Sequence, residues 1–379
     1  AALTPVRCEL SLAAGKVLAE DIYSPIDIPA FDQSSMDGYA FSFKDWKLNQ
    51  SLEVKGEIAA GSNPSAILLA GSAVRIFTGA AVPHGADTVV MQEKAKLQND
   101  HLIIDDENIV RGANVRARGS EIKTGDLALA QDSLLTPAAI GFLASMGVIE
   151  VLIYPYPSIS LIVTGNELQI PGKPLQPGQV YESNSFSLTA ALKLLNMPEI
   201  KVFKAEDSLE KVTQVLKEAL QQSDVVFLTG GISVGDYDFV LQAATACEVK
   251  TLFHKVRQRP GKPLYVGKKG NTLVFGLPGN PASVLTCFYE YAEPALKKMV
   301  RQKTGVRIIQ ARLASPFKKA AGLTHFLKGY YDGTTVTALH GQESYRLSSF
   351  ANANCLIQID ETVTDCSEGT QVDVHLLNF

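Results

Sequence analysis

The feature that most constrains the fold is an order of segments that repeats between residues 149 and 304. Three apolar runs, SISLIV, DVVFL and TLVFG, are each followed by a glycine-containing loop and a segment of helical periodicity, near 183–196, 236–247 and 281–300. Such alternation is typical of a parallel sheet with helices on both faces. We therefore predict a doubly wound, three-layer α/β domain over residues 149–304.

The segments on either side of this domain have a different pattern of residues. Between residues 25 and 124, short apolar runs alternate with glycine, proline and aspartate, which predicts a β-rich domain. Helical patterns over 8–22 and 136–148 flank it, so residues 1–24 and 125–148 are predicted to form one small divided domain. Residues 305–379 return to strand patterns and predict a C-terminal β domain. The expected fold class is an α/β multidomain protein.

Composition excludes several classes of function. The 39 acidic and 35 basic side chains give a net charge of −4, which provides no basic field for nucleic acid. No apolar run reaches about 18 residues, so we expect no membrane partner. Five cysteines without a CxxC pair favour a reducing, cytoplasmic setting. The chain begins at Ala1 rather than methionine, and we expect this to reflect processing or a trimmed start.

Three loops that leave predicted strand ends share the same chemistry. They read TGNEL from Thr164, TGGISVGDYD from Thr229 and GLPGNPAS from Gly276. Ligands of open α/β sheets bind beyond the carboxyl ends of the strands, and free backbone N–H groups at helix starts favour anions. We predict that these loops bind phosphate or another oxyanion, with ordinary turn chemistry as the alternative for the PGNP segment taken alone. The binding residues predicted here are Thr164, Gly165, Asp236, Gly279 and Asn280.

A basic segment, FHKVRQRPGKPL, adds fixed positive charge. Its Lys255, Arg259 and Lys262 surround a Pro-Gly turn. Arginine and lysine held by prolines can clamp phosphate or a tetrahedral oxyanion. A solvated basic loop is the alternative interpretation.

Acidic residues in the same loops predict a divalent cation. Glu167, Asp236 and Asp238 lie beside the proposed phosphate-binding glycines, and carboxylates repel phosphate unless a cation lies between them. We therefore expect Mg²⁺ or a similar hard ion among these carboxylates. The alternative for Asp236 is a helix cap.

The chain resembles the molybdopterin molybdenumtransferase family, or MoeA family, which includes the E domain of gephyrin. The resemblance is carried by motifs that occur in order over nearly the whole chain: SSMDGYA, RIFTGAAVPHGADTVVMQE, VRARGSEIKTGD, TGNEL, GGISVGDYDF, RPGKP and GLPGNPAS. It implies an enzyme that takes adenylylated molybdopterin and molybdate, releases AMP and leaves molybdenum on the pterin dithiolene. It also implies a homodimer with a cleft shared between subunits, a β-barrel-like fourth domain, and a molybdopterin adenylyltransferase as upstream donor.

The resemblance also implies roles for individual residues. Asp37, Thr78 and Gly79 look like second-domain residues that reach the cleft of the partner subunit. Glu167, Asp207 and Asp238 resemble the acidic residues of the third-domain pocket, with Asp238 nearest the scissile phosphate. Those that resemble the phosphate cradle are Gly230, Gly231, Ser233 and Gly235, and those that resemble the molybdate site are Lys255, Arg259, Lys262, Pro263, Pro278, Pro281 and Ser283.

Three positions depart from the family pattern. Asn166 stands where many relatives carry aspartate or serine, and Arg259 replaces a usual lysine. Leu323 stands where relatives often have arginine, which leaves Lys328, Ser344 and Arg346 as candidates for a fourth-domain contribution.

Two other functions remain open from the residues alone. A metal-dependent nucleotide pyrophosphatase can use the same glycine loops and acidic ligands, because both serve any phosphoanhydride. A non-catalytic dimeric scaffold is the other alternative, but it would not require the acidic and basic site residues.

Overall fold

The structure is a computed structural model that describes residues 3–62, 67–230, 239–302 and 305–377. The chain divides into two compact units, one formed by Ala1–Val6 with Tyr154–Phe379 and the other by Arg7–Ile153. Within the described residues, no helix has both the length and the apolar character needed to cross a membrane.

The larger unit is built around a six-stranded sheet in the order β17-β14-β18-β22-β21-β19. Four neighbouring strands are parallel: β17 (Ile200–Ala205), β14 (Ile159–Thr164), β18 (Val225–Thr229) and β22 (Thr272–Leu277). The strand β21 (Tyr265–Lys269) is antiparallel to its neighbours β22 and β19 (Lys250–His254). Every residue of β14 and β18 is buried, as expected for central strands covered on both faces.

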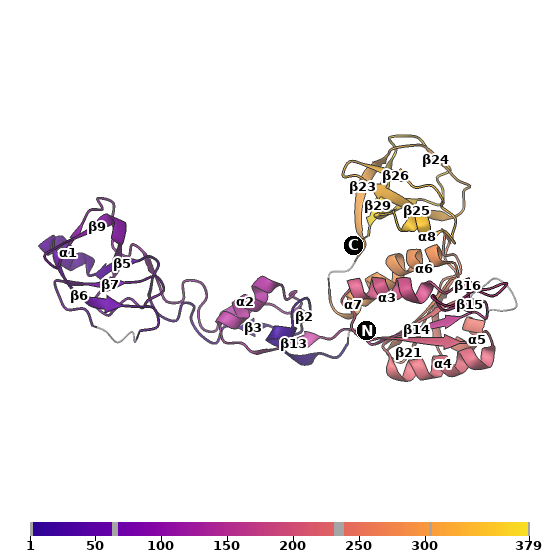
Figure 1. Cartoon of the computed structure of the whole chain (residues 1–379), viewed down its shortest axis with the longest axis horizontal. Helices are drawn as coiled ribbons and strands as arrows, with labels where there is room; N and C mark the ends of the chain where they lie inside the picture. The colour runs from indigo at the N-terminus through magenta and orange to yellow at the C-terminus, as the bar shows by residue number, and fades with distance from the viewer. Residues whose placement is uncertain (1–2, 63–66, 231–238, 303–304, 378–379) are drawn as a thin grey trace. The chain divides into compact units, whose positions relative to one another are not determined.

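Helices cover both faces of this sheet (Figure 1). One face carries α3 (Asn184–Leu194), α6 (Pro281–Cys287) and α7 (Glu293–Met299), with a π-helical turn η3 (Phe288–Ala292) joining the last two. The other face carries α4 (Leu209–Gln222) and α5 (Phe239–Ala246). Alternate strand residues enter two hydrophobic cores, one on each face of the sheet. Leu161 and Phe227 pack in the core that contains Leu188 of α3, and Ile162 and Val226 pack in the core that contains the buried residues of α4 and α5. The predicted doubly wound fold is confirmed.

The C-terminal part of the larger unit is a closed five-stranded barrel. Its strands are β23 (Arg307–Leu313), β25 (Thr324–Tyr331), β26 (Thr335–Ala338), β27 (Cys355–Ile359) and β29 (Gln371–Leu376). The order β25-β26-β23-β29-β27 closes because β25 also pairs with β27. A short strand of the α/β part, β20 (Gln258–Arg259), extends the barrel sheet by pairing with β25. Three short elements complete it: β24 (Phe317–Lys318), β28 (Asp365–Cys366) and α8 (Leu347–Phe350).

The sequence predicts strands of this domain at VRIIQARL, GTTVTALH, CLIQID and QVDVHLL, and the longest barrel strand, β25, is not among them. It buries His325 and Lys328, two residues that a sequence pattern assigns to the surface. Tertiary contacts therefore decide this strand.

Most of the smaller unit is a β-rich region with a six-stranded sheet in the order β8-β5-β7-β6-β10-β9. The strands are β5 (Gly38–Phe41), β6 (Leu52–Ile58), β7 (Ser72–Ile76), β8 (Thr88–Met91), β9 (Ala95–Gln98) and β10 (His101–Ile104). Helix α1 (Phe43–Asn49) and the 3-10 turn η2 (Gln92–Lys94) lie between strands, and α1 places Trp46 in a core with Phe41 and Leu52.

A second region of the smaller unit forms around helix α2 (Pro137–Ser145). Thr136 caps this helix by accepting a hydrogen bond from the N–H of Ala139. The helix packs on a three-stranded sheet of β1 (Val6–Glu9), β13 (Glu150–Tyr154) and β2 (Val17–Leu18). The remaining strands form two short pairs: β3 (Ile22–Tyr23) with β12 (Leu127–Leu129), and β4 (Gln33–Ser34) with β11 (Val115–Arg116).

The helix predicted over residues 8–22 is wrong. In its place lie β1, a 3-10 turn η1 (Leu10–Leu12), β2 and the start of β3. Gly15 adopts a positive φ of 78°, which ends any helix there, and the pairing of β2 with β13 buries Val17 and Leu18. The exact domain boundaries drawn from the sequence stay predictions.

Candidate functional site

The three glycine-containing loops meet at one edge of the α/β sheet. Their strands, β14, β18 and β22, are adjacent and parallel, so their carboxyl ends lie together. The Thr164 hydroxyl donates to the carbonyl of Thr229 at 3.4 Å, and a Cβ built on Gly279 would lie 3.8 Å from the Cα of Gly230. The structure thus brings together the described predicted residues of all three loops.

Close approach of two loops explains the glycine at position 230. Gly230 has a φ of +85°, and a Cβ built there would lie 2.4 Å from the Thr164 carbonyl oxygen. Because backbone oxygen cannot move aside, a larger residue would separate the loops. Gly230 is therefore required by packing at the site, whatever ligand the loop binds.

Several predicted residues lie outside the described part of the chain. They are Gly231, Ser233, Gly235, Asp236 and Asp238. Their roles stay predictions.

Two carboxylates stand close together at this edge. Burial, followed by repulsion from Glu167, raises the pKa of Asp207 above its usual range. The Oδ1 atom of Asp207 is buried and has no hydrogen-bond partner among the residues that the structure describes, while the backbone N–H of Asp207 donates to the Asn166 side chain at 3.2 Å. Within the described ranges, no three His, Cys, Asp or Glu residues gather as a metal site. The pair still offers the hard oxygen ligands that Mg²⁺ prefers.

A cleft of about 750 Å³ lies where the α/β part and the barrel meet. We call it the oxyanion cleft, and the residues that line it are Gln258, Arg259, Pro260, Gly261, Lys262, Pro263, Pro278, Gly279, Asn280, Ser283, Leu323, Gln342, Glu343, Ser344 and Tyr345. It contains most of the predicted molybdate-site residues; Lys255 and Pro281 are not among its lining residues. The Asn280 amide donates to the Ser344 hydroxyl at 2.8 Å, which joins the two walls.

The cationic side chains of this cleft are available to a ligand. Arg259 and Lys262 are exposed, and neither side chain forms a hydrogen bond or ion pair with any residue that the structure describes. Leu323 also lines the cleft, where its apolar side chain contributes no charge.

Lys328 has a structural role that the sequence did not reveal. Its ammonium is buried and donates to the carbonyls of Gly341, Glu343 and Arg346 at 2.7, 3.1 and 3.1 Å. Burial lowers its pKa. Lys328 therefore holds the barrel loop that presents Ser344 to the oxyanion cleft, rather than facing the cleft itself.

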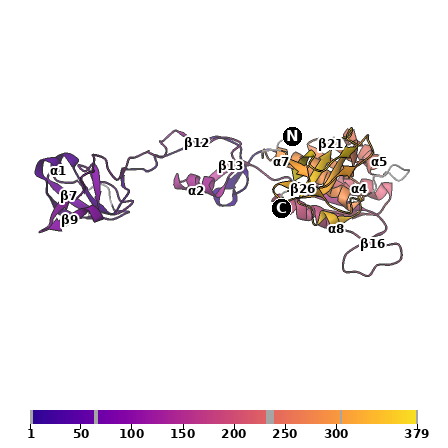
Figure 2. The same ribbon diagram turned by 90° about the horizontal axis from the view of Figure 1, so that it is seen from above.

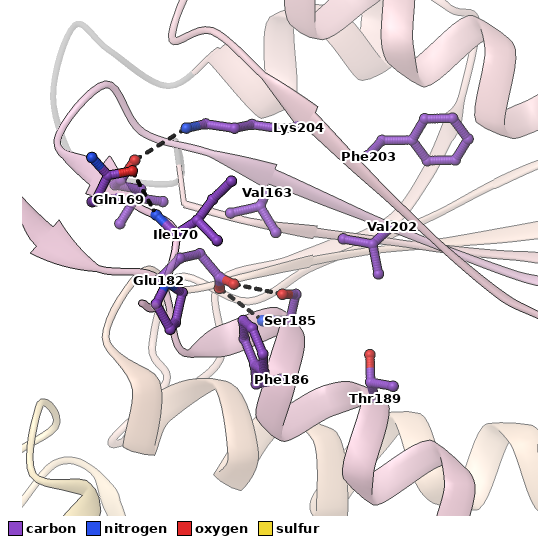
Figure 3. Close-up of a pocket in the computed structure, with 12 residues that line it drawn as sticks. Val163, Gln169, Ile170, Glu182, Ser185, Phe186, Thr189, Val202, Phe203 and Lys204 are labelled. Carbon is purple, nitrogen blue, oxygen red and sulfur yellow. Dashed lines mark hydrogen bonds between the residues drawn. The ribbon is translucent and has the colours of Figure 1, made fainter. Parts of the chain in front are cut away.

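A second hollow, of about 420 Å³, differs in character (Figure 3). Val163, Val202, Phe203 and Phe186 give it apolar walls between β14, β17 and α3. Its one lysine, Lys204, donates to the Leu168 carbonyl at 3.0 Å. Residues 170–179 project beside it, ahead of the short strand β16 (Val180–Tyr181) that pairs with β15 (Leu168–Gln169) (Figure 2). No predicted site residue lines this hollow, and its walls do not suit a phosphate.

The smaller unit brings together its own predicted residues. Asp37 Oδ1 accepts hydrogen bonds from the backbone N–H and the hydroxyl of Thr78, both at 2.7 Å. The backbone bond is the largest cause of a lowered pKa for Asp37. Gly79 follows with a φ of +82°, and its N–H donates to the carbonyl of Ser34 at 2.8 Å. Two segments that are 41 residues apart thus form one exposed acidic corner.

Comparison with known proteins agrees over the whole chain. Residues 1–147 match the MoeA N-terminal region (domain I and II), 160–298 a probable molybdopterin binding domain, and 310–377 the MoeA C-terminal region (domain IV). A molybdopterin molybdenumtransferase of Haemophilus influenzae is 36% identical over 97% of this chain and 93% of its own length. A protein of the same name from Nostoc sp. is 34% identical over 96% of this chain and 87% of its own.

A solved structure agrees as well. The crystal structure of the molybdopterin biosynthesis MoeA protein of Pyrococcus horikoshii is 30% identical and superposes with a TM-score of 0.86, covering 99% of this chain and 95% of that one. With this agreement in sequence and in fold, the chain belongs to the MoeA family, the molybdopterin molybdenumtransferases.

Proposed function

We propose that this chain inserts molybdenum from molybdate into adenylylated molybdopterin, releasing AMP in molybdenum cofactor biosynthesis. Family membership supports this reaction, and one observation carries it in the structure. The oxyanion cleft presents two cationic side chains, Arg259 and Lys262, that no described carboxylate neutralises. Fixed positive donors in a cleft suit a small oxyanion better than a neutral ligand.

In this proposal the cleft residues hold molybdate. Lys262 supplies a compact charge, and Arg259 supplies a planar guanidinium that can donate two parallel hydrogen bonds. The Ser344 hydroxyl stays in place because Asn280 donates to it. Positioning and charge stabilisation then supply most of the rate, and no protein nucleophile is needed.

The adjacent loop edge binds the pterin and AMP phosphates. Glu167 and Asp207 with Asp238 would hold Mg²⁺, and the unpartnered buried oxygen of Asp207 fits such a ligand. Bound there, Mg²⁺ would supply positive charge that offsets the charge of the phosphoanhydride. Glu167, Asp207 and Asp238 orient the anhydride beside the oxyanion cleft. In the absence of the cation, two close carboxylates would repel the same phosphate.

The proposal also covers the oligomeric state and the cellular compartment. Asp37, Thr78 and Gly79 would reach the cleft of a second subunit, so the working form would be a homodimer in the cytoplasm. A molybdopterin adenylyltransferase would supply the substrate, and neither nucleic acid nor a membrane would take part. The four domains would have the boundaries predicted from the sequence.

The test is anaerobic AMP release from adenylylated molybdopterin with Mg²⁺, with and without molybdate. The proposed reaction requires molybdate for release and yields a molybdenum-loaded pterin. Release that is indifferent to molybdate would instead support a pyrophosphatase, and tight binding without release would support a scaffold. The relatives reported above support neither alternative.

A substitution of a proposed Mg²⁺ ligand tests the role of the metal in AMP release. Asp238→Asn should abolish AMP release while the protein keeps its wild-type thermal unfolding. Normal turnover by this variant would remove Asp238 from the mechanism.

A further inference from the structure

A second pocket lies in the barrel, next to the oxyanion cleft. We call it the barrel pocket; it has a volume of about 230 Å³, and its walls include Arg259, Phe317, Lys318, Lys319, His325 and Gln342. Four of these six side chains are basic or can become cationic. No carboxylate is among the described residues that line it. The volume suits a tetrahedral oxyanion with several water molecules, since one water fills about 30 Å³.

The strand pairing explains why Arg259 and His325 lie together. They are register partners in the parallel pair β20 and β25, so they stand side by side in adjacent strands. The segment around Arg259 belongs to the α/β part, whereas His325 belongs to the barrel. The pocket therefore exists only because β20 joins the barrel sheet.

His325 is built into the wall with its ring nitrogens unused. Its side chain is 9% exposed, and the Phe317 ring packs against it edge-on at 6.4 Å. Neither ring nitrogen forms a hydrogen bond with any residue in the described part of the chain. These nitrogens are therefore free to bond with a ligand or water in the pocket.

Lys319 brings a fixed charge to the same pocket. Its ammonium donates to the carbonyls of Leu323 at 2.9 Å, Glu361 at 3.4 Å and Ala320 at 3.5 Å, and it forms no ion pair with a carboxylate of the described residues, so it contributes charge to the pocket. Two nearby acids are paired elsewhere, Glu361 with Arg257 at 3.3 Å and Asp365 with Lys318 at 3.0 Å. A third, Asp360, has its pKa lowered by hydrogen bonds from Thr362 and, to a smaller extent, by the charge of Lys319. Burial and the charges of Lys319 and Arg259 lower the pKa of His325, as expected where cations crowd one space.

We propose that the barrel pocket is a second oxyanion site, which binds a free tetrahedral dianion between Arg259, Lys319 and His325. Arg259, Pro260 and Gln342 line both the pocket and the oxyanion cleft, so one guanidinium serves two anion sites. This site goes beyond the proposed reaction and does not depend on it. The ligand class is molybdate, sulfate or phosphate, which share the same charge and shape.

Equilibrium dialysis of the full chain at physiological ionic strength tests the proposal, with radiolabelled molybdate and sulfate used separately. The wild type should bind two molybdate ions per chain. His325→Phe should lose the barrel site and bind one, with at least tenfold weaker binding at that site, because phenylalanine fills the space without a donor. Lys262→Met should lose the cleft site and also bind one, and the double variant should bind none. Arg312→Met, an exposed barrel arginine remote from the pocket lining, is the matched control and should bind two.

The outcomes are distinct. If the His325→Phe chain binds as many ions as the wild type, or if Lys262→Met alone abolishes all binding, the proposal is wrong. Should His325→Phe fail to unfold cooperatively, Lys319→Gln takes its place with the same expectation. Sulfate that fills the barrel site as well as molybdate would support a general oxyanion site, and molybdate alone would support a second substrate site. Because the readout is binding, a failure of AMP release would leave this result standing.

Discussion

The loop edge of the α/β sheet and the oxyanion cleft beside it are built from opposite charges. At the edge, Glu167 and Asp207 crowd two negative charges together, and one oxygen of Asp207 has no partner among the described residues. In the cleft, Arg259 and Lys262 are positive, and their side chains pair with no residue in the described ranges. A protein built only for stability would pair such groups with each other. Their separation leaves one region ready for a cation and the other ready for an anion, as transfer between a phosphoanhydride and an oxyanion requires.

Between these two regions, the largest expected effect comes from removing the cleft charge. Lys262→Met should lower molybdate-dependent AMP release at low molybdate by about 30- to 160-fold, because one charge-assisted hydrogen bond contributes about 2–3 kcal/mol. The loss should appear as a raised KM for molybdate. Lys298→Met, an exposed lysine on α7, is the control and should keep full activity. An equal loss in both variants would show that general charge, and not the cleft, attracts the anion.

The next largest effect is expected at Lys328, which supports one wall of the oxyanion cleft. Lys328→Met should lower the free energy of unfolding by about 2–3 kcal/mol, because three carbonyls lose the ammonium that they share. Urea unfolding measures this change. Lys328→Arg keeps the charge and should recover part of the stability. A Lys328→Met protein of wild-type stability would contradict the assigned structural role.

A smaller effect is expected at the acidic edge. Asp207→Asn should raise the Mg²⁺ concentration needed for half-maximal activity by about tenfold, since it removes one oxygen charge near the proposed ion. Without Mg²⁺ the same variant should unfold about 1–3 °C higher than the wild type, because it relieves repulsion and burial of charge. Calorimetry in chelator checks the second part. A lower unfolding temperature would mean that Asp207 stabilises the chain.

The smallest expected effect is a difference in how Asp37 and Asp207 change the stability of the chain with pH. The folded pKa of Asp37 is lowered, so its contribution to stability is present above the unfolded pKa of about 3.9 and is lost as pH falls through the folded pKa. The folded pKa of Asp207 is raised, so its cost is absent below about pH 3.9 and grows as pH rises through the folded pKa. The unfolding temperatures of Asp37→Asn and Asp207→Asn should therefore diverge from wild type in opposite directions as pH rises from 3 to 7, measured without Mg²⁺. Shifts of the same sign would contradict this assignment.

Much of the fold could be predicted because periodic patterns record which faces are buried. The doubly wound domain follows from apolar runs such as those of β14 and β18, which are buried throughout. Helix α2 follows from its Thr136 cap and Pro137. The helix predicted at 8–22 is wrong because its pattern is local. Residues there are good helix formers, but they form strands that pair with β13, which lies more than 120 residues away in the chain.

The sequence by itself determined the family, the order of sheet and helices, and the chemical types of the site: glycine loops, carboxylates and a basic turn. Those features are local, and each can be recognised without its neighbours in space. Only the tertiary structure decided that Asp207 has an unpartnered oxygen, that Lys328 serves three carbonyls, and that β20 joins the barrel to place Arg259 beside His325. The physical reason is that burial, pairing and pKa depend on residues distant in the chain, which periodicity and motifs do not record.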